Sequence, residues 1–140
     1  MDIQVFPTLS VDSKIENFSA VKEWLQSILD QIDCEGKPAK QLFIAVDEIF
    51  TNIVNYAYEN IGKIELLATF NQTDNTLKIT IKDNGFAYNP LEKPDPDIAK
   101  RIKDKTIGGL GVFMVKKLTD SIEYYRQENE NILILNKKIN

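Results

Sequence analysis

The chain has 140 residues, enough for one domain that buries roughly two-thirds of its unfolded surface without a disulfide or a structural metal. Its 17 lysines and arginines against 21 aspartates and glutamates give a formal net charge of −4, which argues against direct nucleic-acid binding, because that needs a concentrated basic face. There is no histidine, so Ser-His-Asp and Cys-His nucleophilic systems, His-ligated zinc sites and a phospho-accepting histidine are all excluded.

The single cysteine, Cys34, lies between Asp33 and Glu35, whose negative charges disfavour a thiolate. We interpret it as an unreactive thiol in a reducing compartment. No apolar run approaches the roughly 20 residues of a membrane-spanning helix, and the N-terminus lacks the basic-then-apolar pattern of a signal peptide. The sequence therefore predicts a soluble, cytoplasmic protein without a membrane partner.

The first half of the chain predicts a short strand and two helices. Residues 3–6 form a short apolar run closed by Pro7, which suits an edge strand. Apolar residues then recur at helical spacing over residues 13–32. A second helix is expected from about Pro38, a residue favoured in the first helical turn, to about Tyr58.

The second half predicts two β-hairpins with a loop and a third helix between them. The four strands are expected over residues 63–70, 76–82, 121–127 and 131–138. Turn-forming residues fill 71–75 of the first hairpin and 128–130 of the second. The loop runs from about residue 89 to 108, and the helix after it ends near Thr119. Because helices and paired strands are partly segregated, we expect a single domain with an α+β fold, a two-layer sandwich.

The second predicted helix carries a polar stripe. Glu48, Asn52 and Asn55 stand at i, i+4 and i+7, so their side chains fall within a narrow arc of the helix surface. One interpretation is the solvated face of an amphipathic helix. The other is a chemical site, because an amide oxygen is a ligand for Mg²⁺ and a carboxylate one turn away accepts a proton. The apolar Ile44 and Ala45 lie close to the same arc, which is unusual for a solvated face.

A second constellation, Asp83-Asn84-Gly85, follows directly after the strand predicted over residues 76–82. These are turn-forming residues, and a strand-terminating turn is one interpretation. The other is a base-binding site, in which the Asp83 carboxylate accepts a hydrogen bond from an exocyclic amine and Gly85 leaves room for a flat ring. The residues alone leave both interpretations open.

A third constellation, Gly108-Gly109-Leu110-Gly111, leads into the third predicted helix. Glycines there let backbone amides approach a phosphate, which the helix N-terminus also favours, whereas the alternative is a hinge or tight turn. The pattern is neither a dinucleotide-binding fingerprint nor a P-loop. The preceding loop carries a basic cluster, which is either a solvated loop or a lid over phosphates: Lys93, Lys100, Arg101, Lys103 and Lys105.

In this order and spacing, the three constellations resemble the N, G1 and G2 boxes of the GHKL superfamily of ATPases, the Bergerat fold. The segments 46–58 and 107–120 most resemble the anti-sigma-factor serine/threonine kinases of that superfamily. The resemblance covers nearly the whole chain. It implies one histidine kinase-like ATPase domain over residues 1–140, with a mixed, mainly antiparallel sheet and helices on one face.

The resemblance also implies cofactors and residue roles, with ATP and Mg²⁺ as the cofactors. Asn52 would coordinate the Mg²⁺ that bridges the ATP phosphates, and Glu48 would be the catalytic general base toward a serine or threonine hydroxyl. Asp83 would accept the adenine amino group, and Gly85 would leave room for the ring.

The remaining roles concern the phosphates. Gly108, Gly109, Leu110 and Gly111 would shape the phosphate-binding loop. Asn55 would lie next to the metal site, and Arg101 or Lys105 would reach the γ-phosphate.

Two positions depart from the family pattern. Tyr56-Ala57-Tyr58 stands where many relatives have His-Ala-Tyr, and Ala87 replaces the second glycine of the Asp-x-Gly-x-Gly box. Ala87 adds a methyl group near the nucleotide and removes easy access to positive φ, which would weaken or alter ATP binding without abolishing it.

The function implied is an ATP-dependent protein serine/threonine kinase that is also an anti-sigma factor. It would phosphorylate a STAS-domain anti-anti-sigma factor in a partner-switching system, with a sigma factor as a second partner and a homodimer as its assembly. An alternative is an ATP-gated binding module that sequesters a regulatory protein without phosphoryl transfer. A third reading is an α+β domain without a nucleotide.

Overall fold

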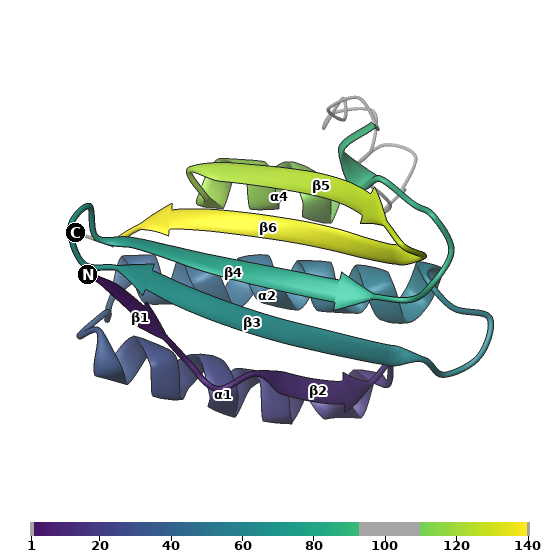
Figure 1. Ribbon diagram of the computed structural model, residues 1–140, viewed down its shortest axis with the longest axis horizontal. Coiled ribbons are helices and arrows are strands. Elements are labelled where there is room, and N and C mark those ends of the chain that lie inside the picture. The colour runs from purple at the N-terminus through teal and green to yellow at the C-terminus, as the bar shows by residue number, and fades with distance from the viewer. Residues whose placement is uncertain (1, 93–109, 140) are drawn as a thin grey trace.

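In the computed structural model, which describes residues 2–92 and 110–139, one sheet is covered by helices on one of its faces (Figure 1). The helices are α1 (Phe18–Gln31), α2 (Lys37–Tyr56) and α4 (Leu110–Leu118), with short 3-10 helices η1 (Ile15–Asn17) and η2 (Pro90–Glu92). This arrangement confirms the predicted two-layer α+β sandwich. Over the described ranges, no helix has the length and apolar character needed to cross a membrane.

The described sheet has six strands. They are β1 (Ile3–Val5), β2 (Leu9–Asp12), β3 (Lys63–Asn71), β4 (Thr76–Asp83), β5 (Ser121–Gln127) and β6 (Glu130–Lys138). Their order is β1-β3-β4-β6-β5, with β2 also pairing with β3, and the pairings described are all antiparallel. Because β4 and β6 are antiparallel neighbours, the end of β4 lies against the start of β6, with Asp83 opposite Asn131.

The strands alternate between a face buried under the helices and a face turned away from them. The buried residues of β3 are Ile64, Leu66, Ala68 and Phe70. The same face continues through β4 and β6 with Leu77, Ile79, Ile81, Leu133 and Leu135. This period of two is that of an antiparallel sheet with one covered face, so the core lies between the sheet and the helices.

Helix α2 contributes much of that core. Its buried residues are Ala39, Leu42, Ala45, Val46, Ile49, Phe50 and Ile53. The Phe50 ring is fully buried and lies 5.7 Å from the Phe18 ring at the start of α1. Ala45 is buried whereas Ile44 is 40% exposed. Ala45 therefore belongs to the apolar face of α2, and only Ile44 lies on its polar face. The orientation of α2 is thus set by its apolar face.

The helix predicted from residue 13 begins later. Residues 9–12 form β2, Lys14 is extended, and α1 starts at Phe18 after the turn of η1. The predicted start was too early, because Ser13 bonds to Gly62 beside the sheet and Ile15–Asn17 form a 3-10 turn; β2 itself was not predicted, since its pairing with β3 is a long-range contact. The other element bounds agree with the sequence prediction to within two residues where the structure describes them.

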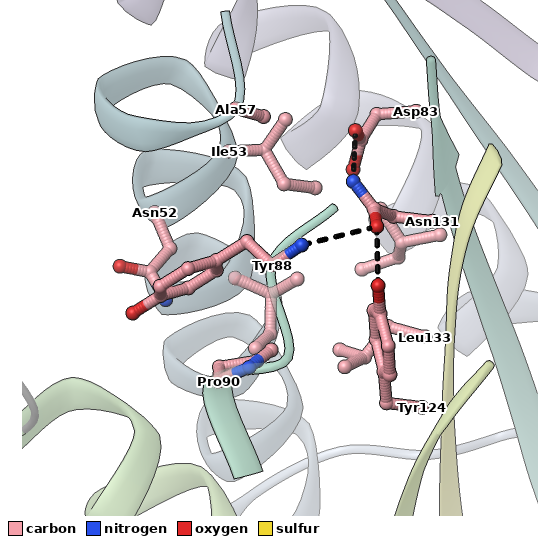
Figure 2. Close-up of a pocket in the computed structure, with 11 residues that line it drawn as sticks. Asn52, Ile53, Ala57, Asp83, Tyr88, Pro90, Tyr124, Asn131 and Leu133 are labelled. Atoms are coloured by element: carbon pink, nitrogen blue, oxygen red, sulfur yellow. Dashed lines mark hydrogen bonds between the residues drawn. The ribbon is translucent and has the colours of Figure 1, made fainter. Parts of the chain in front are cut away.

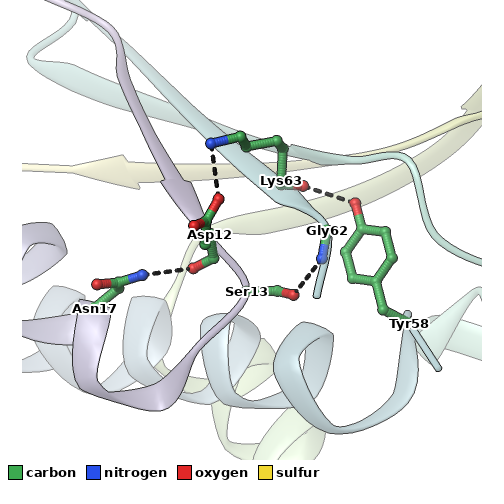
Figure 3. A network of polar contacts seen from close by, with 6 residues as sticks. All are labelled: Asp12, Ser13, Asn17, Tyr58, Gly62 and Lys63. Atoms are coloured by element: carbon green, nitrogen blue, oxygen red, sulfur yellow. Dashed lines mark hydrogen bonds and ion pairs between the residues drawn. The ribbon is translucent and has the colours of Figure 1, made fainter. Parts of the chain in front are cut away.

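A set of short polar contacts joins the start of the chain to the α2–β3 connection (Figure 3). The Ser13 N–H donates to the Gly62 carbonyl, and the Gly62 N–H donates back to Ser13 Oγ, both at 2.8 Å. The Tyr58 hydroxyl donates to the Lys63 carbonyl at 2.7 Å. These contacts fix the path of the chain as it leaves α2 toward the sheet.

Candidate functional site

A cavity of about 30 Å³ lies between α2, the facing ends of β4 and β6, and the segment after β4 (Figure 2). Its apolar lining residues are Ile49, Ile53, Ala57, Ile81, Pro90 and Leu133. Its polar lining residues are Asn52, Asp83, Tyr88, Tyr124 and Asn131. An apolar lining with a few convergent polar groups is typical of small-molecule sites. This accessible space is about that of a water molecule and is smaller than a nucleobase.

Asp83 supplies the buried carboxylate of this cavity. It ends β4 and is 5% exposed. Its Oδ1 accepts hydrogen bonds from Asn131 Nδ2 and from the Gly85 N–H, both at 2.9 Å. Burial raises the pKa of the Asp83 carboxyl above its ordinary value of 3.8, while these two donors and the charge of Arg126 act in the opposite direction. Asp83 is therefore a fixed acceptor at one side of the cavity, suited to an amine donor.

Gly85 is required for the approach of this loop to the end of α2. A Cβ at Gly85 would lie 2.1 Å from the Ala57 carbonyl oxygen, which is far inside a normal contact. The same carbonyl accepts a hydrogen bond from the Phe86 N–H at 2.8 Å. Gly85 does not itself line the cavity, so the structure gives it a packing role, and the predicted role of leaving room for a ring stays a prediction.

Helix α2 places Asn52 at the cavity and Glu48 one turn earlier. Asn52 lines the cavity on the side opposite Asp83 and Asn131 (Figure 2). Glu48 is half-buried and does not line the cavity. Burial raises the pKa of the Glu48 carboxyl above its ordinary value of 4.5, and the neighbouring charge of Asp47 adds to this. A carboxylate with a raised pKa is a stronger base, as a proton acceptor requires.

The other predicted site residues are only partly accounted for. Asn55 is exposed and does not line the cavity. Leu110 and Gly111 begin α4, which agrees with a glycine-rich segment leading into a helix. Four predicted site residues lie outside the described residues: Arg101, Lys105, Gly108 and Gly109. The rest of the basic cluster also lies outside them. Their roles stay predictions.

The two departures from the family pattern have separate surroundings. Tyr56 is 54% exposed and stacks on Tyr88, with ring centroids 6.3 Å apart and an interplanar angle of 29°. Ala87 is exposed and lines a second hollow of about 280 Å³ together with Phe86 and Arg126, not the cavity that holds Asp83. The methyl group of Ala87 is therefore not part of the cavity wall.

Sequence reasoning missed three polar residues of the cavity lining, Tyr88, Tyr124 and Asn131, together with Arg126, which bonds to Asn131. Asn131 was assigned only as the first residue of a strand next to a polar turn. The available signal was register: if the strand ending at Asp83 pairs antiparallel with the last strand, the end of one faces the start of the other. The sequence did not reveal that these two strands are neighbours.

The described residues fit the cofactors that the family resemblance implies. The buried Asp83 acceptor and the apolar walls suit a flat base that carries an amine. Among the residues described, no three His, Cys, Asp or Glu side chains gather as a metal site. Asn52 can supply one oxygen to Mg²⁺, an ion that commonly takes its other ligands from water and substrate phosphates.

This two-layer fold, with the cavity between a helix and the sheet, is that of the GHKL ATP-binding domains. The chain belongs to the family of histidine kinase-like ATPase domains, whose family model matches residues 11–137. The resemblance inferred from the three boxes is thereby confirmed.

The chain is also similar to individual proteins. The chain is 28% identical over 131 residues to the serine-protein kinase RsbW of Bacillus thuringiensis, covering 90% of this chain and 81% of that protein. It is 28% identical over 112 residues to the serine/threonine-protein kinase BtrW of Bordetella bronchiseptica, covering 80% and 79%.

A solved structure agrees on the fold. The crystal structure of the RsbU and RsbW domains of Rv1364c from Mycobacterium tuberculosis matches 95% of this chain with a TM-score of 0.67 and 17% identity. This chain spans 32% of that longer chain. At this identity the match shows a shared fold.

Proposed function

We propose that this protein is an ATP-dependent protein serine/threonine kinase that also acts as an anti-sigma factor. Its membership of the histidine kinase-like ATPase family and its similarity to two proteins named serine or serine/threonine kinases support the general assignment. Because the sequence contains no histidine, the protein cannot carry a phosphoryl group on a histidine of its own.

The observation that carries the proposal is the meeting of two boxes at one cavity. Asn52 from α2 and Asp83 from the end of β4 line the same space from opposite sides (Figure 2). In the proposed complex, Asp83 binds the adenine amine and Asn52 contributes an oxygen to Mg²⁺ at the phosphates. The described lining therefore supports a ligand with a base at one end and an anionic, metal-binding group at the other.

The proposed reaction transfers the γ-phosphoryl group of ATP to a hydroxyl. The hydroxyl oxygen of a serine or threonine on the protein substrate forms a new bond to the γ-phosphorus, the bond from that phosphorus to the β–γ bridging oxygen breaks, and ADP leaves. Glu48 takes the hydroxyl proton. Its raised pKa supports this role, as does its position on α2 one turn before Asn52, the proposed Mg²⁺ ligand.

The proposed partners are regulatory proteins. The substrate is a STAS-domain anti-anti-sigma factor, and a sigma factor is the second partner, which the protein holds when ATP is bound. We propose that it works as a homodimer in the cytoplasm and makes no direct contact with nucleic acid or membrane.

A phosphorylation assay tests the proposal. Purified protein is incubated with γ-labelled ATP, Mg²⁺ and a STAS-domain protein encoded next to its gene, and label on the STAS protein is measured. We expect transfer by the wild type, loss of transfer in Glu48→Gln, and retained transfer in Asp47→Asn, which removes a neighbouring exposed carboxylate. Undiminished transfer by Glu48→Gln would contradict the role of Glu48.

Two further measurements separate the kinase from the ATP-gated binding module. Calorimetry measures ATP binding, and chromatography measures ADP formation in the presence of the STAS protein. Tight ATP binding without ADP or labelled product would support the binding module and exclude the kinase.

A further inference from the structure

Asn131 is the centre of a buried hydrogen-bond network at the cavity. It lies near the start of β6, opposite Asp83, and is 5% exposed. Its Nδ2 donates to Asp83 Oδ1 at 2.9 Å and to the Phe86 carbonyl at 2.7 Å. Its Oδ1 accepts from the Tyr88 N–H, the Tyr124 hydroxyl and an Arg126 guanidinium N–H.

These contacts use the full capacity of the Asn131 amide. An amide nitrogen has two hydrogens, and both are donated; the amide oxygen already accepts from three donors. The orientation of the amide is also unambiguous, because Nδ2 meets only acceptors and Oδ1 meets only donors. Asn131 has no hydrogen left for a ligand, so any effect it has on a ligand acts through the groups it holds.

The group it holds most directly is Asp83. Within the described residues, both hydrogen bonds of Asp83 end on Oδ1, which leaves Oδ2 as the acceptor open to a ligand. Donation from Asn131 favours the ionised form of Asp83 and so opposes the rise in pKa that burial causes. An ionised carboxylate only accepts hydrogen bonds, so it pairs with an amine and repels a carbonyl oxygen.

The same residue ties the loop after β4 to the sheet. The Phe86 carbonyl and the Tyr88 N–H both bond to the Asn131 side chain, and the Arg126 guanidinium adds a bond to the Gly85 carbonyl at 2.9 Å. The backbone of residues 85–88 is thereby held against β5 and β6. This loop carries Tyr88, which lines the cavity.

We propose that Asn131 is a positioning residue that sets the preference of the site for adenine over guanine. It fixes one oxygen of Asp83 and holds the neighbouring loop, so that the other oxygen of Asp83 meets the amine of adenine rather than the carbonyl of guanine. The inference rests on the proposed nucleotide function and deepens it.

Two substitutions test different halves of the network. Asn131→Leu keeps the approximate shape and removes every hydrogen bond. Asn131→Asp keeps the acceptor contacts with Tyr88, Tyr124 and Arg126 but replaces the donor to Asp83 with an oxygen. The matched control is Asn136→Leu on the same strand, whose amide bonds to Ser121 Oγ at 3.0 Å on the exposed side.

Calorimetry with ATP and with GTP, both with Mg²⁺, gives the main measurement. We expect ATP affinity to fall by at least about tenfold in Asn131→Leu, because a displaced Asp83 loses its hydrogen bond to the adenine amine, while GTP affinity does not fall. The preference for ATP then falls by the same factor. A role confined to general stability would lower both affinities together. Unfolding by urea without nucleotide checks that each variant is folded.

The Asn131→Asp variant adds a pH signature. At neutral pH its two facing carboxylates repel, and ATP affinity relative to wild type is low. When the pair binds one proton, the protonated carboxyl donates to its neighbour again, so the relative affinity recovers as pH falls. The other ionisable groups around Asp83 are Arg126 on β5, Glu130 on β6 and Tyr58 after α2.

The outcomes distinguish this inference from the function on which it rests. If wild type binds ATP, and folded Asn131→Leu has the same ratio of ATP affinity to GTP affinity as wild type, the inference is overturned and the nucleotide function stands. If wild type binds no ATP, both are overturned. If Asn131→Asp does not fold at neutral pH, the Asn131→Leu ratio decides.

Discussion

The Tyr58 hydroxyl accepts a hydrogen bond from the Asn84 N–H at 2.6 Å, which ties the segment that follows α2 to the loop after β4. The same hydroxyl donates to the Lys63 carbonyl at the start of β3. Tyr58 is the last residue of the Tyr56-Ala57-Tyr58 segment in which the family resemblance was noted. A tyrosine suits this position because its hydroxyl joins the loop after β4, which follows Asp83, to the segment that leaves α2, the helix that carries Asn52.

Tyr58→Phe should destabilise the protein and weaken nucleotide binding together. The substitution removes both hydrogen bonds and leaves the ring packed, so we expect a loss of about 1–2 kcal/mol in the free energy of unfolding. Urea unfolding measures the loss, and Tyr125→Phe, whose exposed hydroxyl bonds to Glu123, is the control. Equal stability of the two variants would contradict the bracing role of Tyr58.

The rate of phosphoryl transfer should fall in acid with a midpoint above the ordinary glutamate pKa of 4.5. Glu48 must be ionised to accept a proton, and its pKa is raised, so activity is lost as pH falls through that raised value. Asp47 contributes to the rise, so Asp47→Asn should move the midpoint to lower pH. Rates from pH 4.5 to 8 on both proteins measure this. A midpoint that does not move would remove Glu48 as the titrating base.

Asp83→Asn should trade function for stability. The folded-state pKa of Asp83 is raised, so the ionised carboxylate costs stability once pH has risen through that pKa, and a neutral amide avoids this cost. We expect a higher melting temperature than wild type at pH 7 without nucleotide, an advantage that disappears below about pH 3.8, the ordinary aspartate value. Asp74→Asn in the exposed turn after β3 is the control.

The same variant should lose its thermal response to ATP. An amide nitrogen at the position of Oδ2 offers a hydrogen to the adenine amine instead of accepting one. Millimolar ATP should therefore raise the melting temperature of wild type and of Asp74→Asn, but not that of Asp83→Asn. An unchanged ATP response in Asp83→Asn would show that adenine binds elsewhere.

Gly85→Ala should disrupt the loop whereas Ala87→Gly should be mild. The Cβ at position 85 meets the Ala57 backbone, so the loop must move, at a cost of about 1–3 kcal/mol in the free energy of unfolding and with weaker ATP binding. Ala87 is exposed and outside the cavity lining, so restoring a glycine there should change ATP affinity by less than about threefold, because an exposed position contributes little. A large gain in ATP affinity from Ala87→Gly would instead support the predicted effect of the Ala87 methyl group.

The layers of the fold and one side of the cavity were predictable from local patterns. Period-two burial in β3 and β4 and the apolar face of α2 are properties of neighbouring residues, and they gave the element types and most bounds. β2 and Asn131 were missed for one physical reason, since each is defined by pairing with a distant strand. Gly85 was predicted to leave room for a flat ring, whereas the structure shows that it avoids a clash with Ala57. That clash was not predictable, because it exists only once α2 and β4 are packed together.

Asp83 and Asn131 are 48 residues apart in the sequence, and this separation affects the order in which the site forms during synthesis. A nascent chain that carries α2 and β4 already contains Glu48, Asn52 and Asp83 but still lacks the strand that orients Asp83. In the proposed complex, nucleotide binds the oriented Asp83, so it stabilises only chains in which the β5–β6 hairpin has docked beside β4. Ligand binding would in this way act as a check on completed sheets.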